Sequence, residues 1–153
     1  MVRLAVLGVG KSRCSWADAA VADYSKRLKR HGKLDVRIAK PERFKGNIEA
    51  VRAAEATRLL KLVGPREVLV ALDERGEDLD SHGFAALLDA LNLDGTVVFA
   101  IGGAYGLHET VRSAARRTVR LSNLVLNHEV ARVVLYEQLY RAVTINKGIP
   151  YHH

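Results

Sequence analysis

Apolar residues along the chain gather in short runs, separated by stretches with helical spacing. Runs of roughly four to eight residues rich in valine, leucine and isoleucine are typical of buried strands, whereas apolar positions repeated every three or four residues predict amphipathic helices. The predicted strands cover 2–9, 34–39, 67–72, 97–101 and 118–121, and the predicted helices, with their capping residues, cover 15–31, 47–63, 81–91, 108–117 and 129–143.

Strands that alternate with helices in this way favour an α/β fold with a mostly parallel sheet. No internal repeat, linker or low-complexity segment interrupts the alternation, so we expect a single domain over residues 1–153. A chain of 153 residues can bury about two thirds of its unfolded surface. Ligands of such sheets bind beyond the carboxyl ends of the strands, and a site is therefore expected there.

Capping and turn residues mark the ends of the predicted elements. The expected N-caps are Ser15, Asn47, Ser81 and Asn127, and Gly32 is expected to end the first helix. The segment 73–76, Asp-Glu-Arg-Gly, has the composition of a turn and is expected to end the third strand.

Three predicted strands end at Leu72, Ile101 and Leu121. If these ends are neighbours, one ligand can touch all three. Gly102 and Gly103 follow the second of these strands and lack a Cβ, so their backbone amides can approach a ligand closely. A tight turn from strand to helix is the alternative reason for glycine there.

The loop 122–126, Ser-Asn-Leu-Val-Leu, is unusually apolar. Loops normally lie in water, so we expect something to cover this one. Its aliphatic side chains suit the wrapping of a flat apolar group such as an adenine, and packing under a helix or a neighbouring subunit is the alternative. The helix that follows, 129–143, is apolar nearly all round.

Glycines after the first predicted strand imitate two nucleotide-binding signatures. A Walker A loop ending at residues 11–12 requires glycine where the chain has Ala5, and a dinucleotide fingerprint starting at Gly8 requires glycine where it has Arg13. Neither signature is complete, so a nucleotide-dependent oxidoreductase or NTPase ranks last. The single Cys14 excludes an internal disulfide and a clustered-cysteine metal site, no HExxH zinc pattern is present, and no metal is expected.

The charge of the chain favours a polyanionic partner. The formal net charge is +7 and the isoelectric point is about 9.8, and cations on a small domain bind polyanions by releasing counterions. Basic residues gather between positions 26 and 45, and those of the first helix are expected opposite an apolar stripe that includes Trp16, Tyr24 and Leu28. A solvated face without a partner is the alternative.

The chain has no apolar run of the roughly 18 residues that a membrane span requires. Its N-terminus begins directly with a strand pattern. We therefore expect a cytoplasmic protein without membrane contact.

Four motifs occur together in a fixed order: Leu-Asp-Glu-Arg-Gly at 72–76, Ile-Gly-Gly-Ala-Tyr-Gly at 101–106, Glu-Gln-Leu-Tyr-Arg-Ala at 137–142 and Pro-Tyr-His at 150–152. In this order and spacing the chain resembles the ribosomal RNA large subunit methyltransferase H family, which belongs to the SPOUT class of trefoil-knotted methyltransferases. The resemblance runs from Val2 to the last residue.

The resemblance implies an α/β-knot fold in which the C-terminal helix threads through a loop, against the usual rule of unthreaded connections. It implies a homodimer that transfers a methyl group from S-adenosylmethionine to N3 of a pseudouridine in 23S ribosomal RNA, on the assembled 70S ribosome. The cofactor contacts that it implies are Leu72, Gly102, Leu121, Ser122, Asn123, Leu124, Val125 and Leu126.

One position departs from the family pattern. The family usually has proline just before the histidine that opens the last helix, and this chain has Asn127. Proline in the first helical turn and asparagine at the N-cap both start helices, so we expect the loop to keep its geometry.

Methylation of an imide nitrogen requires loss of its proton, and hence a base or a cation that stabilises the anion. The residues expected to act on the RNA side are Arg141, Tyr151 and His152, and the expected RNA contacts are Lys26, Lys29, Arg30, Lys33 and Arg132. An ion pair to Glu137 and packing of the tail are the alternatives for the first set. A non-enzymatic RNA-binding or ribosome-associated factor with the same fold is the alternative function.

Overall fold

The computed structural model describes all of residues 1–153. Strands and helices alternate along the chain. They are β1 (Val2–Val9), α1 (Ser15–Lys29), β2 (Gly32–Ala39), α2 (Ile48–Lys61), β3 (Val68–Asp78), α3 (Ser81–Asn92), β4 (Val97–Ile101), α4 (Glu109–Ala114), β5 (Arg117–Arg120) and α5 (His128–Lys147).

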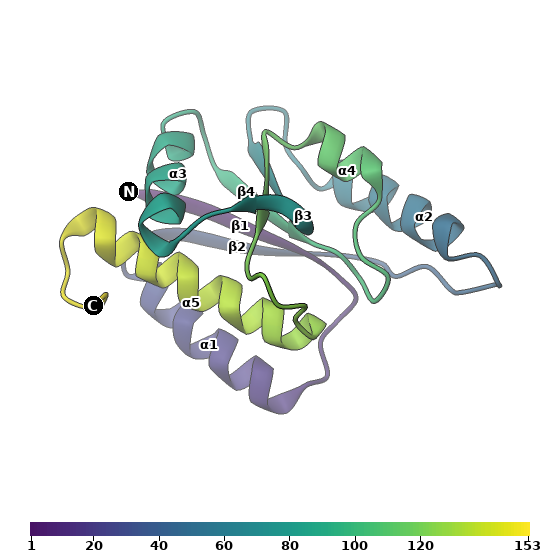
Figure 1. The fold of residues 1–153 in the computed structure, drawn as a ribbon, viewed down its shortest axis with the longest axis horizontal. Coiled ribbons are helices and arrows are strands. Elements are labelled where there is room, and N and C mark those ends of the chain that lie inside the picture. Colours follow the sequence, from purple (N-terminus) through teal and green to yellow (C-terminus); the bar gives the residue numbers. More distant parts are fainter.

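The five strands form one parallel sheet in the order β2-β1-β4-β3-β5, with helices on both sides (Figure 1). This confirms the α/β fold with a parallel sheet that the alternation predicts. β4 lies at the centre, and all five of its residues are buried. Because the strands are parallel, their carboxyl ends meet at one edge of the sheet.

Two apolar layers hold the helices on the sheet. Alternate residues of each strand face opposite sides, so Leu4 and Val6 of β1 belong to one layer and Ala5 and Leu7 to the other. The first layer also contains buried residues of α1, α3 and α5, and the second contains residues of α2 together with Val111 of α4. None of the helices is both long and apolar enough to cross a membrane.

The predicted turn at 73–76 is wrong. β3 continues through this segment to Asp78, and its pairing with β5 shifts register so that Leu72 and Glu77 both lie opposite Val119. The intervening residues form a bulge, which bends the strand without ending it. A Cβ on Gly76 would lie 2.6 Å from the carbonyl carbon of Val119, so this glycine permits close approach of two strands.

Two predicted N-caps are one residue too late. Cys14 precedes α1 and makes no side-chain capping bond, and the α3 cap is Asp80, whose carboxylate accepts a hydrogen bond from the backbone N–H of Gly83. Ser81 instead donates its hydroxyl to Gln138 of α5. Gly32 does not end α1, because the helix stops at Lys29 and Gly32 already begins β2.

The predicted caps Asn47 and Asn127 are confirmed, since each side chain accepts a backbone N–H of its helix. α5 is longer than predicted and runs to Lys147, where Gly148 adopts a left-handed conformation with φ of 67°. Trp16 does not belong to the buried stripe of α1. It is exposed, whereas Leu28 is buried.

Arg37 joins β2 to the loop between α2 and β3. Its guanidinium donates to both carboxylate oxygens of Glu67, at 2.6 and 2.8 Å, and to the carbonyl of Leu62 at 2.8 Å. The same carboxylate accepts the backbone N–H of Gly64. These bonds favour the ionised carboxylate, so the pKa of Glu67 lies below its usual value, chiefly because of the hydrogen bonds from Arg37.

Replacing Glu67 with glutamine should lower the free energy of unfolding at neutral pH by roughly 1.5–3 kcal/mol, because the guanidinium loses its charged partner. The lowered pKa of Glu67 means that its stabilisation is complete above the unfolded-state pKa, near the usual 4.5, and is lost as the pH falls below it. Urea unfolding from pH 7 to pH 3 should therefore show a smaller loss in Glu67→Gln than in the wild type. Glu74→Gln, at an exposed position, is the control and should follow the wild type.

Candidate functional site

The three strand ends singled out from the sequence lie together. A cavity of about 360 Å³ opens at the carboxyl end of β4, at the bulge of β3 that follows Leu72, and beside the loop after β5, and these three strands are neighbours in the sheet. Of the predicted cofactor contacts, those that line it are Leu72, Gly102, Leu121, Ser122, Leu124, Val125 and Leu126. Asn123 does not line it. We call this space the donor cavity.

The glycine loop 102–107 forms one wall of the donor cavity. A Cβ on Gly102 would lie 2.6 Å from the carbonyl carbon of Gly106, and Gly106 itself has a φ of 83°. The backbone N–H of Gly106 donates to the carbonyl of Gly103 at 3.0 Å. The loop therefore needs glycine to make its tight turn, and the turn also brings backbone close to the cavity.

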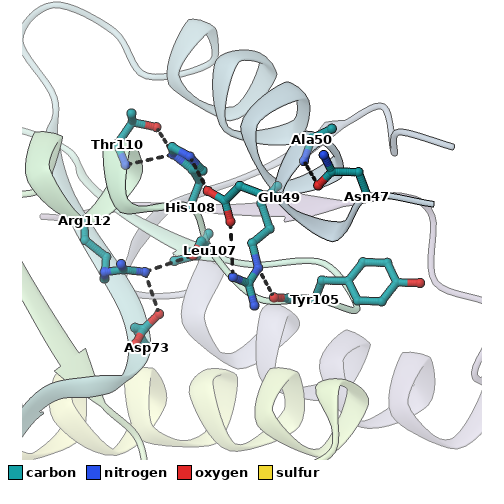
Figure 2. Close-up of polar contacts among 10 residues, drawn as sticks. Asn47, Glu49, Ala50, Asp73, Tyr105, Leu107, His108, Thr110 and Arg112 are labelled. Carbon is teal, nitrogen blue, oxygen red and sulfur yellow. Dashed lines mark hydrogen bonds and ion pairs between the residues drawn. The ribbon is translucent and has the colours of Figure 1, made fainter. Parts of the chain in front are cut away.

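Two arginines hold the glycine loop from opposite sides. Arg52 of α2 donates its Nε–H to the carbonyl of Tyr105 at 2.7 Å, and Arg112 of α4 donates to the carbonyl of Leu107 at 2.9 Å (Figure 2). Arg112 also lies 3.4 Å from Asp73, the residue that follows Leu72 in β3. Sequence reasoning missed both arginines, because each looks like an ordinary charge of an amphipathic helix.

His108 ties α4 to α2 in the same cluster. Its Nδ1 accepts the backbone N–H of Thr110 as the N-cap of α4, so the ring proton lies on Nε2, which is 2.9 Å from Glu49 (Figure 2). Together with Arg52, this contact fixes the glycine loop to the start of α2.

Arg120 at the end of β5 is the one side chain with a fully enclosed polar atom that lacks a partner. It lines the donor cavity, and one of its terminal nitrogens pairs with Asp78 at 3.3 Å, but its Nε–H has no acceptor. A buried donor without an acceptor is costly. The sequence does not distinguish Arg120 from other surface arginines.

The apolar loop is not covered within a single chain, so no helix of the same chain provides the expected cover. Leu124 is 76% exposed and Val125 is 85% exposed, although both border the donor cavity. The loop is locally ordered by Ser122, whose hydroxyl accepts the backbone N–H of Leu124. A ligand or a second chain is therefore needed to shield these side chains from water.

The three residues expected to act on the RNA side cluster at the far end of α5. Arg141 donates from Nη1 to Nδ1 of His152 at 3.0 Å, from Nε to Glu137 at 2.8 Å, and its guanidinium carbon lies 4.8 Å from the ring centre of Tyr151. The hydroxyls of Tyr151 and Tyr24 are 3.3 Å apart. Burial, reinforced by that hydrogen bond, raises the pKa of Tyr151 to about 12, so it remains a neutral phenol.

This cluster does not line the donor cavity of its own chain. Arg141 lies 13 residues beyond His128, which corresponds to about 20 Å along an α-helix. Figure 1 shows the C-terminus at the end of α5 opposite the loop that precedes the helix. A single chain therefore does not bring the donor cavity and the predicted RNA-side residues together.

The predicted RNA contacts fall in two places. Lys26, Lys29, Arg30 and Lys33 are exposed near the C-terminal end of α1 and form no ion pairs, so their charges are free. Arg132 lies elsewhere, near the start of α5, where it pairs with Asp18 at 2.9 Å and Glu129 at 3.0 Å. We call these four residues, at the end of α1 and the start of β2, the basic surface, and Arg132 does not belong to it.

Lys147 and His31 extend this basic surface onto the end of α5, since Nζ of Lys147 is 3.4 Å from Nδ1 of His31. Burial, together with the charges of Lys147 and Arg30, lowers the pKa of His31. No group of three or more histidine, cysteine, aspartate or glutamate side chains is arranged to hold a metal ion.

The fold has counterparts among known proteins. The family model described as "Predicted SPOUT methyltransferase" matches residues 2–152. The structure resembles the "Probable Methyltransferase" of Bordetella pertussis Tohama I with a TM-score of 0.59 at 18% identity, covering 93% of this chain and 95% of that one. It also resembles a probable methylase family protein of Haemophilus influenzae Rd KW20 with a TM-score of 0.53 at 13% identity, covering 99% and 72%. Fold and sequence thus define a SPOUT methyltransferase, a class that uses S-adenosylmethionine.

Relatives of higher identity narrow this class. Ribosomal RNA large subunit methyltransferase H of Geotalea daltonii is 43% identical over 155 aligned positions, which cover 99% of this chain and all of that one. The protein of the same name from Trichlorobacter lovleyi is 42% identical, with coverage of 99% and 100%. The chain belongs to the ribosomal RNA large subunit methyltransferase H family, as the resemblance predicts.

Replacing Gly102 with alanine should weaken binding of S-adenosylmethionine about tenfold or more, because the added methyl displaces the backbone of Gly106 from the wall of the donor cavity. Isothermal titration calorimetry measures the affinity directly. Gly148→Ala is the control, since that glycine also resists a side chain, through its φ of 67°, but lies at the other end of α5. Equal affinity in wild type and Gly102→Ala would show that the glycine loop does not shape the donor site.

Proposed function

We propose that the protein methylates N3 of a pseudouridine in 23S ribosomal RNA on the assembled 70S ribosome, with S-adenosylmethionine bound in the donor cavity. The observation that carries this proposal is the convergence of Leu72, Gly102 and the loop 121–126 on one cavity at the carboxyl edge of the sheet. The names of the relatives support a substrate in large-subunit ribosomal RNA. The same proposal keeps the protein in the cytoplasm, where the ribosomes are.

The donor cavity fits S-adenosylmethionine in size and chemistry. Its volume of about 360 Å³ lies within the usual range of small-molecule sites, roughly 300–1,000 Å³. The exposed aliphatic side chains of Leu124 and Val125 suit an adenine ring. When bound, S-adenosylmethionine supplies a methyl group already activated on a sulfonium.

The protein then has to align the acceptor nitrogen and manage its proton. N3 of the base first loses its proton to solvent water, after which its lone pair forms the new N–C bond while the C–S bond breaks and leaves its electron pair on sulfur. Arg141 provides a permanent cation that stabilises the N3 anion. His152 presents Nε2–H toward the acceptor side, because its Nδ1 accepts from Arg141, and the neutral Tyr151 offers a hydroxyl donor.

We further propose a homodimer in which the tail of one protomer completes the donor cavity of the other. About 20 Å of helix separates these parts within one chain, so only a second chain can bring them together. Apolar side chains are left open to water at the end of α5 near the cavity, among them Leu124, Val125 and Val130, and Trp16 of α1 is open as well. An antiparallel pairing of the two α5 helices buries such groups and places the partner's His152 beside the donor cavity.

The trefoil knot belongs to the same proposal. It is supported by family membership and by the position of the loop 121–127, which connects the sheet edge at β5 to the start of α5. The alternative function, a non-enzymatic RNA-binding or ribosome-associated factor, is supported by the free basic surface on α1 alone. Such a factor has no reason to bind S-adenosylmethionine, so calorimetry with that ligand distinguishes the two.

The central experiment incubates the purified protein with labelled S-adenosylmethionine and either 70S ribosomes or separated subunits. Label should enter 23S ribosomal RNA from 70S particles, and mapping should locate it at N3 of a pseudouridine. Label in no RNA, despite donor binding, would leave the protein a binder and refute the proposed reaction.

Mixing two inactive variants tests the composite site. Homodimers of Gly102→Ala and of His152→Ala should each lose most activity, whereas co-expression should restore about a quarter to a half of the wild-type rate, because a mixed dimer keeps one intact donor cavity facing one intact tail. Light scattering should give twice the chain mass of 16.9 kDa. A monomer, or a mixture no more active than its components, would contradict the shared site.

Reversing charge on the basic surface should weaken ribosome binding. Lys29→Glu/Arg30→Glu should raise the dissociation constant and reduce the slope of log K against log salt by roughly 1–2, as expected for the loss of phosphate contacts. Lys61→Glu/Arg66→Glu makes the same change in net charge at exposed positions near the end of α2 and is the control. If the two double variants behave alike, the surface on α1 is merely solvated.

A further inference from the structure

A second cavity, of about 400 Å³, adjoins the donor cavity. The two share Ile101, Gly103, Ala104, Tyr105 and His128 as lining residues. The remaining walls come from the ends of β1 and β2, the start of α2 and the first half of α5. None of the predicted cofactor contacts lines it, so this space is separate from the donor cavity while opening onto it.

One wall of this second cavity is apolar and flat. In the sheet Val6 lies opposite Val36 and Gly8 opposite Ile38, and all four line the cavity from the same face of neighbouring strands. Val36 and Ile38 are about half exposed despite being apolar, and a Cβ added to Gly8 would meet nothing within 4 Å. A planar ring could therefore lie on β1 and β2 without displacing any side chain.

Tyr136 brings a buried hydroxyl without a partner to this cavity. The residue is only 1% exposed, and its hydroxyl makes no hydrogen bond within the chain. The Tyr136 hydroxyl is not fully enclosed, because Arg120 Nε is the only fully enclosed side-chain polar atom without a partner. The hydroxyl therefore reaches the cavity surface. Burial raises the pKa of Tyr136 to about 12, which keeps the hydroxyl a neutral donor.

Six charged side chains line this cavity: Lys11, Arg37, Glu42, Glu55, Glu129 and Arg132. Arg132, one helical turn before Tyr136, is held in place by Asp18 and Glu129. Glu55 of α2 is 6% exposed and forms no ion pair, and one of its carboxylate oxygens accepts the backbone N–H of Glu42. Its other oxygen lies 2.9 Å from the place where a Cβ of Gly103 would be, at the boundary with the donor cavity.

We propose that the second cavity binds the acceptor nucleobase, a pyrimidine with alternating carbonyl and N–H groups, while the methyl donor occupies the neighbouring cavity. This inference rests on the proposed function, and it assigns Tyr136 and Glu55 a part in substrate recognition. A ring carbonyl accepts from the Tyr136 hydroxyl, supported by the positive charge of Arg132, and a ring N–H that is not methylated donates to Glu55. The two ligands then meet where the cavities adjoin, beside Gly103 and Ala104.

Paired carbonyl and N–H groups distinguish such a pyrimidine from other ligands of similar size. A carbonyl oxygen needs a donor and a ring N–H needs an acceptor, and the cavity offers the hydroxyl of Tyr136 as a donor and the carboxylate of Glu55 as an acceptor. Losing a hydrogen bond from a buried site typically costs enough to change binding about tenfold, because the partner is left unpaired. The hydroxyl of Tyr136 is therefore expected to matter for substrate and not for folding.

Two variants test the assignment with 70S ribosomes at saturating S-adenosylmethionine. Tyr136→Phe removes only the hydroxyl, and Gly8→Leu fills the space above β1. Each should lower kcat/KM for ribosomes about tenfold or more, while the calorimetric affinity for S-adenosylmethionine and the melting temperature stay at wild-type values. Ala90→Leu adds a side chain of similar size at an exposed position of α3 and should behave as wild type.

The outcomes separate this inference from the proposed function. If the wild type binds no donor or methylates no RNA, the proposed function fails first. If the wild type is active and either variant keeps kcat/KM within about twofold, the second cavity does not hold the base. A fall in donor affinity equal to the fall in kcat/KM would also overturn the inference, because the cavity would then belong to the donor.

Discussion

Parallel hydrogen bonding of β4 to β3, and of β3 to β5, is the constraint on which the whole site depends. It holds Leu72, Gly102 and Leu121 at one edge of the sheet although they lie far apart in the sequence. A shift of one residue in either pairing would turn the cavity-lining side chains of the shifted strand to the opposite face of the sheet. The cavity would then lose these walls. The buried layers on both faces oppose such a shift, because it would expose every apolar side chain of the strand.

Much of this arrangement could be predicted from the sequence, because burial leaves a pattern in the residues themselves. Strand ends such as Ile101 follow directly from an apolar run, and parallel strands then require the ends to meet. The segment 73–76 shows the limit of local reasoning. Its composition suits a turn as well as a bulge, and only pairing with Val119 more than 40 positions later decides between them.

The charged residues around the cavity could not be predicted, for a different reason. Arg52 and Arg112 act on backbone carbonyls of the glycine loop, and a carbonyl has no signature in the sequence. Arg120 stands out only because its Nε–H is enclosed. The distance between the donor cavity and Arg141, by contrast, was already implied by the predicted length of the last helix, since each helical residue advances the chain by about 1.5 Å.

The ion pair between Arg37 and Glu67 also bears on aggregation, because Arg37 lies in the edge strand β2. β2 is an edge strand of eight residues, so one row of its backbone N–H and C=O groups is unpaired. Its apolar side chains Val36 and Ile38 are also exposed. Such a border readily recruits a strand from another molecule and seeds aggregates. Alternating charges at Lys33, Asp35 and Arg37 oppose such pairing. Arg37 therefore both anchors β2 within its own molecule and protects the free edge of β2 from strands of other molecules.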